Sequence, residues 1–295
     1  MRGHYIWAAA ALLLAACDKP QVAQEDPAGT NWTSFGRTHD EQHYSPLDQI
    51  TDQNVNRLGL AWYADLTPTM NSFSAPLQVD GVLYFATGLT VIHAMDARTG
   101  KELWSYDSKV YEQPGIRMRA GWGIRGIAFD NGKVFSGTLD GRLIALDAKT
   151  GQLLWSVQTL EEGAESYITG PPWVFKGKVA IGFGGADYGP VRGYVTAYDQ
   201  NTGKQAWRFY TVPGDPAKGF ENKAMEMAAK TWTGEWWKWG GGGTVYHAMA
   251  YDTKYNRLYI GAGNGFPWNQ KIRSPGGGDN LFLASIVALD ADTGA

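Results

Sequence analysis

Cysteine and histidine carry much of the metal and redox chemistry that a short motif can reveal, and here their number and spacing exclude several kinds of site. The single cysteine, Cys17, excludes an intrachain disulfide, a four-thiolate zinc site and a CxxCH haem attachment. The histidines beyond the first thirty residues are His39, His43, His93 and His247. None of them has the HxH or HExxH spacing of common metal sites. The histidines therefore indicate no metal site, and the cysteine is informative because of its position in the chain.

Cys17 follows a short apolar run, residues 5–16, which comes after Arg2. Twelve residues are too few to cross a bilayer as a helix, but they fit the apolar core of a secretory signal. The end of the run, Leu-Ala-Ala-Cys, resembles the lipobox of bacterial lipoproteins, in which the cysteine is diacylated; a plain signal peptide is the alternative. We predict a lipoprotein signal peptide at 1–16 and lipidation at Cys17. A polar tether follows at 17–30.

Asp18 resembles the signal that keeps some bacterial lipoproteins in the inner membrane. The predicted location is therefore the periplasmic face of the inner membrane, where the lipid anchors the protein.

Composition limits the class of protein that follows the tether. The chain of 295 residues carries 26 Lys and Arg against 29 Asp and Glu, so nothing in its charge favours nucleic acid as a partner. A hydrophobic content of 44% with low net charge argues against disorder. The 38 glycines and 13 tryptophans, with few charged residues, are typical of an all-β protein with many tight turns.

An internal repeat organises this part of the chain. The copies are AMDARTGKELW at 94–104, ALDAKTGQLLW at 145–155, AYDQNTGKQAW at 197–207 and ALDADTGA at 288–295. Their aspartates are separated by 51, 52 and 91 residues. Repeats of this length indicate a solenoid or a propeller.

Each copy has the residues of a hairpin between two strands. The Asp and Thr of DxxTG can bond to nearby backbone amides, and the glycine supplies a positive φ. The tryptophan then lies on the outgoing strand, where it can fill the gap to the next sheet. Apolar runs such as 82–86 and 91–95 predict strands, and turns at 79–81, 129–133, 175–178 and 255–256 mark a second hairpin in each unit. Four short strands per unit predict a propeller blade.

The long interval contains an insertion around 212–238. Within it, Phe220, Ala224, Met227 and Ala228 are spaced like one face of a short helix after Pro216. We predict a surface excursion that serves a function, and a neutral loop is the alternative.

Four units do not close a ring. The segment 31–66 would supply one strand, 58–63, to a final blade that this sequence does not contain, and an open arc would leave two sheet edges unpaired. We therefore predict that 31–295 is a partial propeller of about four blades, truncated at its C-terminus from a longer protein.

The segments between the repeats resemble the quinone-contacting segments of one enzyme family. They are YITG at 167–170, GFGGADYG at 182–189, and the stretches 231–244, 263–269 and 274–280. Over about 31–295 the chain resembles the N-terminal half of the quinoprotein alcohol dehydrogenases, which depend on pyrroloquinoline quinone (PQQ). The resemblance implies an all-β, eight-bladed β-propeller with PQQ and Ca²⁺ near its axis.

The implied function is the oxidation of a primary alcohol or similar small hydroxyl compound in the periplasm, with electrons passed to a cytochrome c or a membrane quinone. The residues at cofactor-binding positions are Arg125, Thr169, Gly184, Gly185, Ala186, Thr244 and Tyr246. The charge of Arg125 would stabilise the reduced, more anionic ring. Small residues at 184–186 would let backbone amides approach the cofactor acids, and Tyr246 would stack on the quinone.

Asp187 and Asn264 are the implied calcium ligands, because both stand at ligand positions and both carry hard oxygen donors. Calcium takes about six to eight oxygens, so the cofactor would have to supply several. Most of the implied site residues also have a structural alternative. Arg125 could be an inter-blade or surface arginine, Thr169 a turn cap, 184–186 a glycine hairpin, Asp187 a turn residue and Asn264 a loop-stabilising residue.

The chain departs from the family pattern at three places. Arg119 and Ala120 stand where the family has two adjacent cysteines, and Trp122 is a candidate to cover the quinone face instead. Phe73 stands where an acidic residue commonly contacts the cofactor. The catalytic aspartate of the family lies beyond residue 295, so no catalytic residue is assigned.

A cofactor-free, lipid-anchored scaffold propeller, resembling the outer-membrane assembly lipoproteins, is the alternative function. The lipobox and the missing cysteine pair suit a scaffold, whereas the glycine-rich segments do not.

Overall fold

The computed structural model describes residues 26, 28–66, 72–112, 123–161, 164, 166–247 and 249–295. The signal peptide, Cys17 and most of the tether lie outside the described residues, as do Arg119, Ala120 and Trp122. What the sequence predicts for them stays a prediction.

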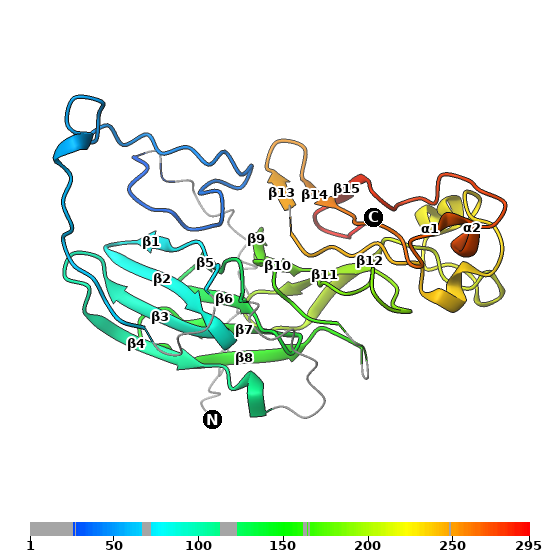
Figure 1. Cartoon of the computed structure of the whole chain (residues 1–295), viewed down its shortest axis with the longest axis horizontal. Coiled ribbons are helices and arrows are strands. Elements are labelled where there is room, and N and C mark those ends of the chain that lie inside the picture. The colour runs from blue at the N-terminus through cyan, green and yellow to red at the C-terminus, as the bar shows by residue number, and fades with distance from the viewer. Residues whose placement is uncertain are drawn as a thin grey trace, which may run out of the picture.

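Four antiparallel sheets follow one another along the chain, and within each sheet every strand pairs with the next one in sequence (Figure 1). The first has β1 (Leu77–Val79), β2 (Val82–Thr87), β3 (Val91–Asp96) and β4 (Glu102–Asp107); the second has β5 (Ala128–Asp130), β6 (Lys133–Gly137), β7 (Arg142–Asp147) and β8 (Leu153–Gln158). The third has β9 (Trp173–Phe175), β10 (Lys178–Ile181), β11 (Tyr194–Asp199) and β12 (Gln205–Tyr210); the fourth has β13 (Met249–Asp252), β14 (Arg257–Gly261) and β15 (Ile286–Asp290). This architecture confirms the predicted all-β arc of about four propeller blades.

The helices are few and short. Two are α-helical, α1 (Lys223–Ala229) and α2 (Gln270–Arg273). The 3₁₀ turns are η1 (Val55–Arg57), η2 (Gly88–Thr90), η3 (Val110–Glu112), η4 (Pro216–Lys218) and η5 (Trp236–Trp239). Among the described helices, none combines the length and hydrophobicity needed to cross a membrane.

The DxxTG turns form as the repeat predicts. Oδ1 of Asp96 accepts hydrogen bonds from the backbone N–H of Arg98 at 3.1 Å and from both the N–H and the hydroxyl of Thr99 at 2.7 Å. Gly100 follows with a φ of 70°. The equivalent bonds are made by Asp147, Asp199 and Asp290.

The repeated tryptophans join each sheet to the next. Trp104 in β4 donates its indole N–H to the carbonyl of Ala148 in the second sheet at 2.9 Å. Its ring lies against Gly151, where a Cβ would come within 2.6 Å of the indole. The equivalent indole bonds are Trp155 to Gln200, Trp207 to Ala291 and Trp62 to Ala97. The prediction that tryptophan fills the gap between sheets is therefore confirmed.

Trp62 makes this contact from the predicted strand 58–63. That segment forms no strand and pairs with none in the described part of the chain, and Leu60 and Tyr63 are exposed. The tryptophan contact thus forms at the first sheet without the strand pairing that accompanies it elsewhere.

One segment, residues 32–41, touches the first strand of every sheet. Its contacts are Trp32 with Gln78 in β1, Thr33 with Phe129 in β5, Glu41 with Trp173 in β9 and His39 with Tyr251 in β13. The strands β5 and β13 both contact β9, so the first strands of successive sheets approach a shared axis. Residues 32–41 therefore cross the arc on its axial side.

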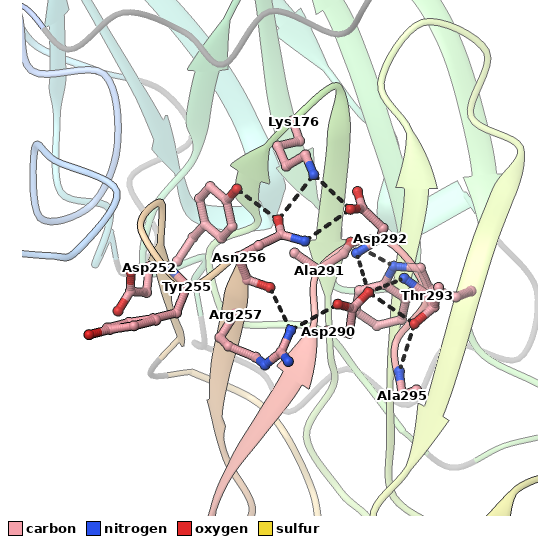
Figure 2. A network of polar contacts seen from close by, with 12 residues as sticks. Lys176, Asp252, Tyr255, Asn256, Arg257, Asp290, Ala291, Asp292, Thr293 and Ala295 are labelled. Atoms are coloured by element: carbon pink, nitrogen blue, oxygen red, sulfur yellow. Dashed lines mark hydrogen bonds and ion pairs between the residues drawn. The ribbon is translucent and has the colours of Figure 1, made fainter.

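The last two sheets are also joined by a polar network, drawn in Figure 2. The ammonium of Lys176 lies 2.7 Å from Oδ2 of Asp292 and donates to Oδ1 of Asn256 at 3.1 Å. The amide of Asn256 donates to the same carboxylate oxygen of Asp292 at 2.9 Å. These bonds, with the hydrogen bond from Lys176 as the largest cause, lower the pKa of Asp292 to about 2.

The insertion after β12 carries α1, and Figure 1 shows α1 and α2 together at the end of the arc away from the first sheet. The predicted helix exists, but its predicted buried face is partly wrong. The helix begins after Asn222, whose Oδ1 accepts from the N–H of Met225 at 2.9 Å, so Phe220 precedes the helix. Met225 and Ala228 are buried, whereas Met227 is exposed.

Candidate functional site

Propeller topology brings four residues from four sheets to one end of the arc. Phe73, Arg125, Thr169 and Tyr246 each come three or four residues before the first strand of their sheet, namely β1, β5, β9 and β13. Because the sheets are equivalent units around one axis, residues at equivalent positions lie at the same end.

The two residues expected to bind metal lie at this end as well. Asp187 follows β10 and Asn264 follows β14, the second strands of the third and fourth sheets. In an antiparallel pair the end of the second strand lies beside the start of the first. The order of the strands therefore gathers all the predicted site residues at the same end of the sheets.

Arg125, Thr169 and Tyr246 form one cluster. The N–H of Arg125 donates to the carbonyl of Thr169 at 2.8 Å, and its Nη1 donates to the Thr169 hydroxyl at 2.5 Å. The guanidinium carbon lies 5.5 Å from the centre of the Tyr246 ring, within the range of a cation–π contact. Thr169 is buried, whereas Tyr246 is 46% exposed and offers a ring face.

A cavity of about 350 Å³ opens beside this cluster. Its lining residues are Phe35, Phe73, Gly123, Arg125 and Thr169. Arg125 is the one charged side chain among them, and in the described part of the chain no carboxylate lies within ion-pair distance of it. A cationic group bordered by aromatic rings in a cavity of this size fits a planar organic anion.

The glycine-rich segment 182–186 lies beside residues 167 and 243–246. The N–H of Gly184 donates to the carbonyl of Tyr167 at 2.8 Å, and the N–H of Tyr167 donates back at 3.1 Å. A Cβ on Gly184 would come 2.7 Å from the Tyr167 ring. The amide of Gly184 is therefore not free to approach a cofactor, which corrects that part of the sequence-based expectation.

The amides of Gly185 and Ala186 differ from that of Gly184. Both residues are buried, and within the described residues neither N–H has a hydrogen-bond acceptor. Unpaired buried N–H groups are rare, so these two fit the expected contact with an anionic group. Gly185 has a φ of 107°, a conformation that favours glycine.

Other glycines of the site are required by backbone packing. A Cβ on Gly170 would come 1.9 Å from the carbonyl oxygen of Tyr246, and one on Gly182 would come 1.8 Å from that of Val245. Thr244 is buried, and its hydroxyl donates to the carbonyl of Phe183. The backbone segments that carry the site are thus closely packed against one another. The hydroxyl of Thr244 already donates its proton to a hydrogen bond within the protein.

Asp187 and Asn264 keep side-chain oxygens that bond to no described residue. The backbone carbonyl of Asp187 accepts a hydrogen bond from the indole of Trp268 at 2.6 Å, and the carbonyl of Asn264 accepts from the N–H of Gly243 at 2.9 Å. The loop 264–268 therefore contacts both the segment that contains Asp187 and the segment that contains Gly243. Among the described residues, no group of three or more His, Cys, Asp or Glu could hold a metal ion. Further oxygen donors would have to complete a site at Asp187 and Asn264.

A second group of titratable residues, which the sequence did not indicate, lines a cavity of about 380 Å³ that Phe35 also borders. Oε1 of Glu41 accepts from the indole of Trp173 at 3.1 Å, and Oε2 lies 3.6 Å from Nε2 of His43. Burial raises the pKa of Glu41 to about 7.

His247 packs against the same Phe35 ring in a T-shaped arrangement, with centroids 4.9 Å apart. Burial and the charge of Arg125 lower the pKa of His247, and its Nδ1 is buried without a hydrogen-bond partner among the residues that the structure describes. His247 is too far in sequence from residues 41 and 43 for a spacing motif to group the three.

Comparison with known proteins shows which proteins the chain is similar to. The family described as "PQQ: Glucose/ethanol/alcohol dehydrogenase, beta-propeller domain" matches residues 32–295. The quinohemoprotein alcohol dehydrogenase ADH IIB of Pseudomonas putida is 53% identical over 285 residues, which are 96% of this chain and 41% of that protein. The 1-butanol dehydrogenase (cytochrome c) of Thauera butanivorans is 44% identical over 272 residues, which are 90% of this chain and 39% of that protein.

Among solved structures, the quinohemoprotein alcohol dehydrogenase of Comamonas testosteroni is similar with a TM-score of 0.86 and 50% identity. The similarity covers 90% of this chain and 40% of that one. The chain therefore spans about 40% of the length of these relatives.

Proposed function

Because the chain belongs to the PQQ-binding β-propeller family of glucose, ethanol and alcohol dehydrogenases, we propose that it forms the cofactor-binding part of a PQQ-dependent alcohol dehydrogenase. The observation that carries the proposal is the cavity beside Arg125, Thr169 and Tyr246, which offers an exposed aromatic face and a cation with no carboxylate in ion-pair distance in the described part of the chain. The bound PQQ would supply the hydride acceptor for oxidation of an alcohol.

The residues of the chain would bind and orient this cofactor. The guanidinium of Arg125, fixed by Thr169, would attract its negative charge, and the ring of Tyr246 would pack on its plane. The amides of Gly185 and Ala186 would donate to its acid groups. Thr244 would contribute its hydroxyl oxygen, while its proton stays with Phe183.

We assign Ca²⁺ to Asp187 and Asn264, whose side-chain oxygens bond to no described residue and are of the kind that this ion prefers. A calcium ion beside the quinone would act as a Lewis acid on a quinone oxygen. Since two side chains are too few, binding of calcium should depend on the cofactor.

A titration of the purified chain with PQQ, with and without Ca²⁺, tests the proposal. We expect a calcium-dependent change in the quinone absorbance, which Asp187→Ala and Asn264→Ala abolish. Asp48→Ala, which removes an exposed carboxylate far from the site in sequence, is the control and should leave the change intact. Binding that is identical in all three variants would show that the metal lies elsewhere.

For the whole protein we propose oxidation of a primary alcohol or similar small hydroxyl compound. The electron acceptor would be a cytochrome c or a membrane quinone; the Thauera relative, 1-butanol dehydrogenase (cytochrome c), supports the first. The scaffold alternative is not favoured, since relatives that share about half of their residues with this chain carry the names of alcohol dehydrogenases.

We further propose that Cys17 is lipidated and holds the protein at the periplasmic face of the inner membrane. The support is the sequence Leu-Ala-Ala-Cys after an apolar run and the absence of any other cysteine. Mass spectrometry of the protein from bacterial membranes should find a diacylated Cys17 at the mature N-terminus, and Cys17→Ser should release the protein into the soluble periplasm. An unmodified N-terminus after a small residue would indicate a plain signal peptide.

A further inference from the structure

Arg192 stands five residues after Asp187, one of the two residues assigned to calcium, and its side chain reaches the insertion that follows β12. Its Nε donates to the carbonyl of Val212 at 2.6 Å. Its Nη1 and Nη2 donate to the two carboxylate oxygens of Glu221 at 2.6 and 3.0 Å. A bidentate pair of this kind has a defined geometry. The segment that carries Asp187 is therefore tied to the insertion through one side chain.

The guanidinium of Arg192 is also held on its flat face. Its central carbon lies 3.8 Å from the centre of the ring of Tyr210, the last residue of β12. A Cβ on Gly214 would come 3.2 Å from Nη1, so the insertion passes close to the charge. The side chain of Glu221 is 43% exposed, and a partly exposed ion pair adds little to stability. The main effect of these contacts is therefore to fix where Arg192 lies.

The backbone of Arg192 contacts a glycine that also contacts the loop of the second calcium residue. Arg192 forms a parallel bridge with Gly242, and the N–H of Gly193 donates to the carbonyl of Gly242 at 2.8 Å. On its other side Gly242 forms an antiparallel bridge with Gly265, which follows Asn264 directly. Gly242 therefore lies between the segment of Arg192 and the loop of Asn264.

The spacing of these segments depends on glycine. Residues 240–243 are four glycines, and all have a φ between 73° and 87°, a conformation that favours glycine. A Cβ on Gly240 would come 2.4 Å from the carbonyl carbon of Val191, and one on Gly242 would come 2.6 Å from the nitrogen of Phe266. No side chain fits between this segment and its neighbours. A shift of the backbone on one side is therefore passed to the other, as in any closely packed region.

We propose that Arg192 is a positioning residue for calcium, through which the insertion after β12 holds Asp187 in place relative to Asn264. Glu221 and the carbonyl of Val212 fix the guanidinium, and the guanidinium fixes the backbone that follows Asp187. Calcium takes its oxygens at about 2.3 to 2.6 Å, so a displaced carboxylate binds it more weakly. This inference rests on the proposed function, in which calcium binds at these two residues with PQQ. It gives the insertion the functional role that the sequence predicts.

The test measures the calcium affinity of the chain in the presence of saturating PQQ. Ca²⁺ is titrated, and the concentration at half of the quinone absorbance change is the calcium midpoint. We expect Arg192→Gln to raise this midpoint about tenfold and Glu221→Gln about threefold, because glutamine keeps a neutral acceptor. The double variant should match Arg192→Gln, since Glu221 acts through Arg192. Arg192→Lys, which keeps the charge but not the planar fork, should lie between the unmodified chain and Arg192→Gln.

Arg142 in β7 is the matched control, because it makes the same kinds of contact in the second sheet. Its Nε donates to Oδ2 of Asp140 at 2.7 Å, and its Nη2 donates to the carbonyl of Ser108 at 2.6 Å. Neither partner belongs to a segment that carries a calcium residue. Arg142→Gln should lower the free energy of unfolding, measured in urea, at least as much as Arg192→Gln does. It should leave the calcium midpoint unchanged.

The outcomes separate a positioning role from a merely structural one. If Arg192→Gln lowers stability and leaves the calcium midpoint in place, this inference is wrong while the proposed function stands. A double variant that binds calcium more weakly than Arg192→Gln would also overturn it, because Glu221 would then act by another route. Should Arg192→Gln fail to fold by circular dichroism, Glu221→Gln decides, and an unchanged midpoint contradicts the inference. If the unmodified chain shows no calcium-dependent change with PQQ, the proposed function falls and this inference with it.

Discussion

Arg125 and Thr169 are joined by two hydrogen bonds, one from the backbone N–H of Arg125 to the Thr169 carbonyl and one from its guanidinium to the Thr169 hydroxyl. The first bond connects the start of the second sheet to the start of the third, and the second fixes the direction of the charge. Neither residue would place the charge alone, since an arginine side chain has several rotatable bonds.

We expect Thr169→Val to weaken the binding of PQQ about tenfold, which is about 1.4 kcal/mol and near the net value of a hydrogen bond to a charged group. Valine keeps the shape of threonine but removes the acceptor for Nη1 of Arg125. Thr169→Ser, which keeps the hydroxyl, should bind PQQ like the unmodified chain. Equal affinities for Thr169→Val and Thr169→Ser, measured by absorbance titration, would contradict the assigned role of this bond.

Trp207 should be essential to the junction of the last two sheets. It is buried, donates to the carbonyl of Ala291 at 3.1 Å and packs against Gly294. Trp207→Ala should lower the free energy of unfolding by about 3 to 5 kcal/mol, as expected for the loss of a large buried ring. Urea unfolding measures this change. Leu154→Ala, at a half-exposed position on β8, should cost far less, and a similar cost for the two would show that the tryptophan contact is not special.

Glu41 should make the stability of the protein fall as pH rises. Burial raises its pKa from 4.5 to about 7, so between these values the folded chain keeps a proton that the unfolded chain has released. The free energy of unfolding should therefore decrease from pH 4.5 to about pH 7 and then level off. Glu41→Gln, which keeps an acceptor for the indole of Trp173, should remove this component. The measurement is thermal or urea unfolding of both proteins at several pH values, and a difference that is the same at pH 5 and pH 8 would count against this account.

His247 should have the opposite effect from Glu41 and should make the stability of the protein rise with pH. Its pKa is lowered from 6.5 by burial first and then by the charges of Arg125 and His43. Below pH 6.5 the unfolded chain binds a proton that the folded chain does not, so this group lowers the free energy of unfolding as pH falls. His247→Asn should be less sensitive to acid than the unmodified chain in the same series of unfolding measurements. A steeper loss of stability in acid for this variant would mean that the imidazole is protonated in the folded protein.

The network around Asp292 should stabilise the junction of the third and fourth sheets only when its carboxylate is ionised. Its pKa is lowered from 3.8 to about 2, chiefly by the hydrogen bond from Lys176, so the contribution is complete above pH 3.8 and is lost as pH falls through 2. Asp292→Asn should lower the free energy of unfolding at pH 7 by about 1 kcal/mol at most, because the carboxylate is partly exposed. The difference from the unmodified chain should disappear near pH 2, and one that persists there would point to packing instead of charge.

The sequence by itself determined the repeat and therefore the fold. Each DxxTG turn is closed by contacts between residues two to four apart, and each tryptophan stands at a fixed distance from its turn. Such local relationships are visible in a sequence because the interacting groups are written close together. The glycine-rich segments and the oxygen donors Asp187 and Asn264 are indicated in another way, by the resemblance of their segments to those of an enzyme family.

The tertiary structure decided how the residues of the site face one another. Phe73, Arg125, Thr169 and Tyr246 each precede the first strand of a different sheet, and only the packing of those sheets around one axis places them at the same end. It also decided that the amide of Gly184 is occupied by Tyr167, and that the helix in the insertion buries Met225 instead of Met227. Glu41, His43 and His247 meet through Phe35 for the same reason. Contacts between distant parts of a chain depend on how rigid units dock, and the residue pattern within any one unit does not contain that information.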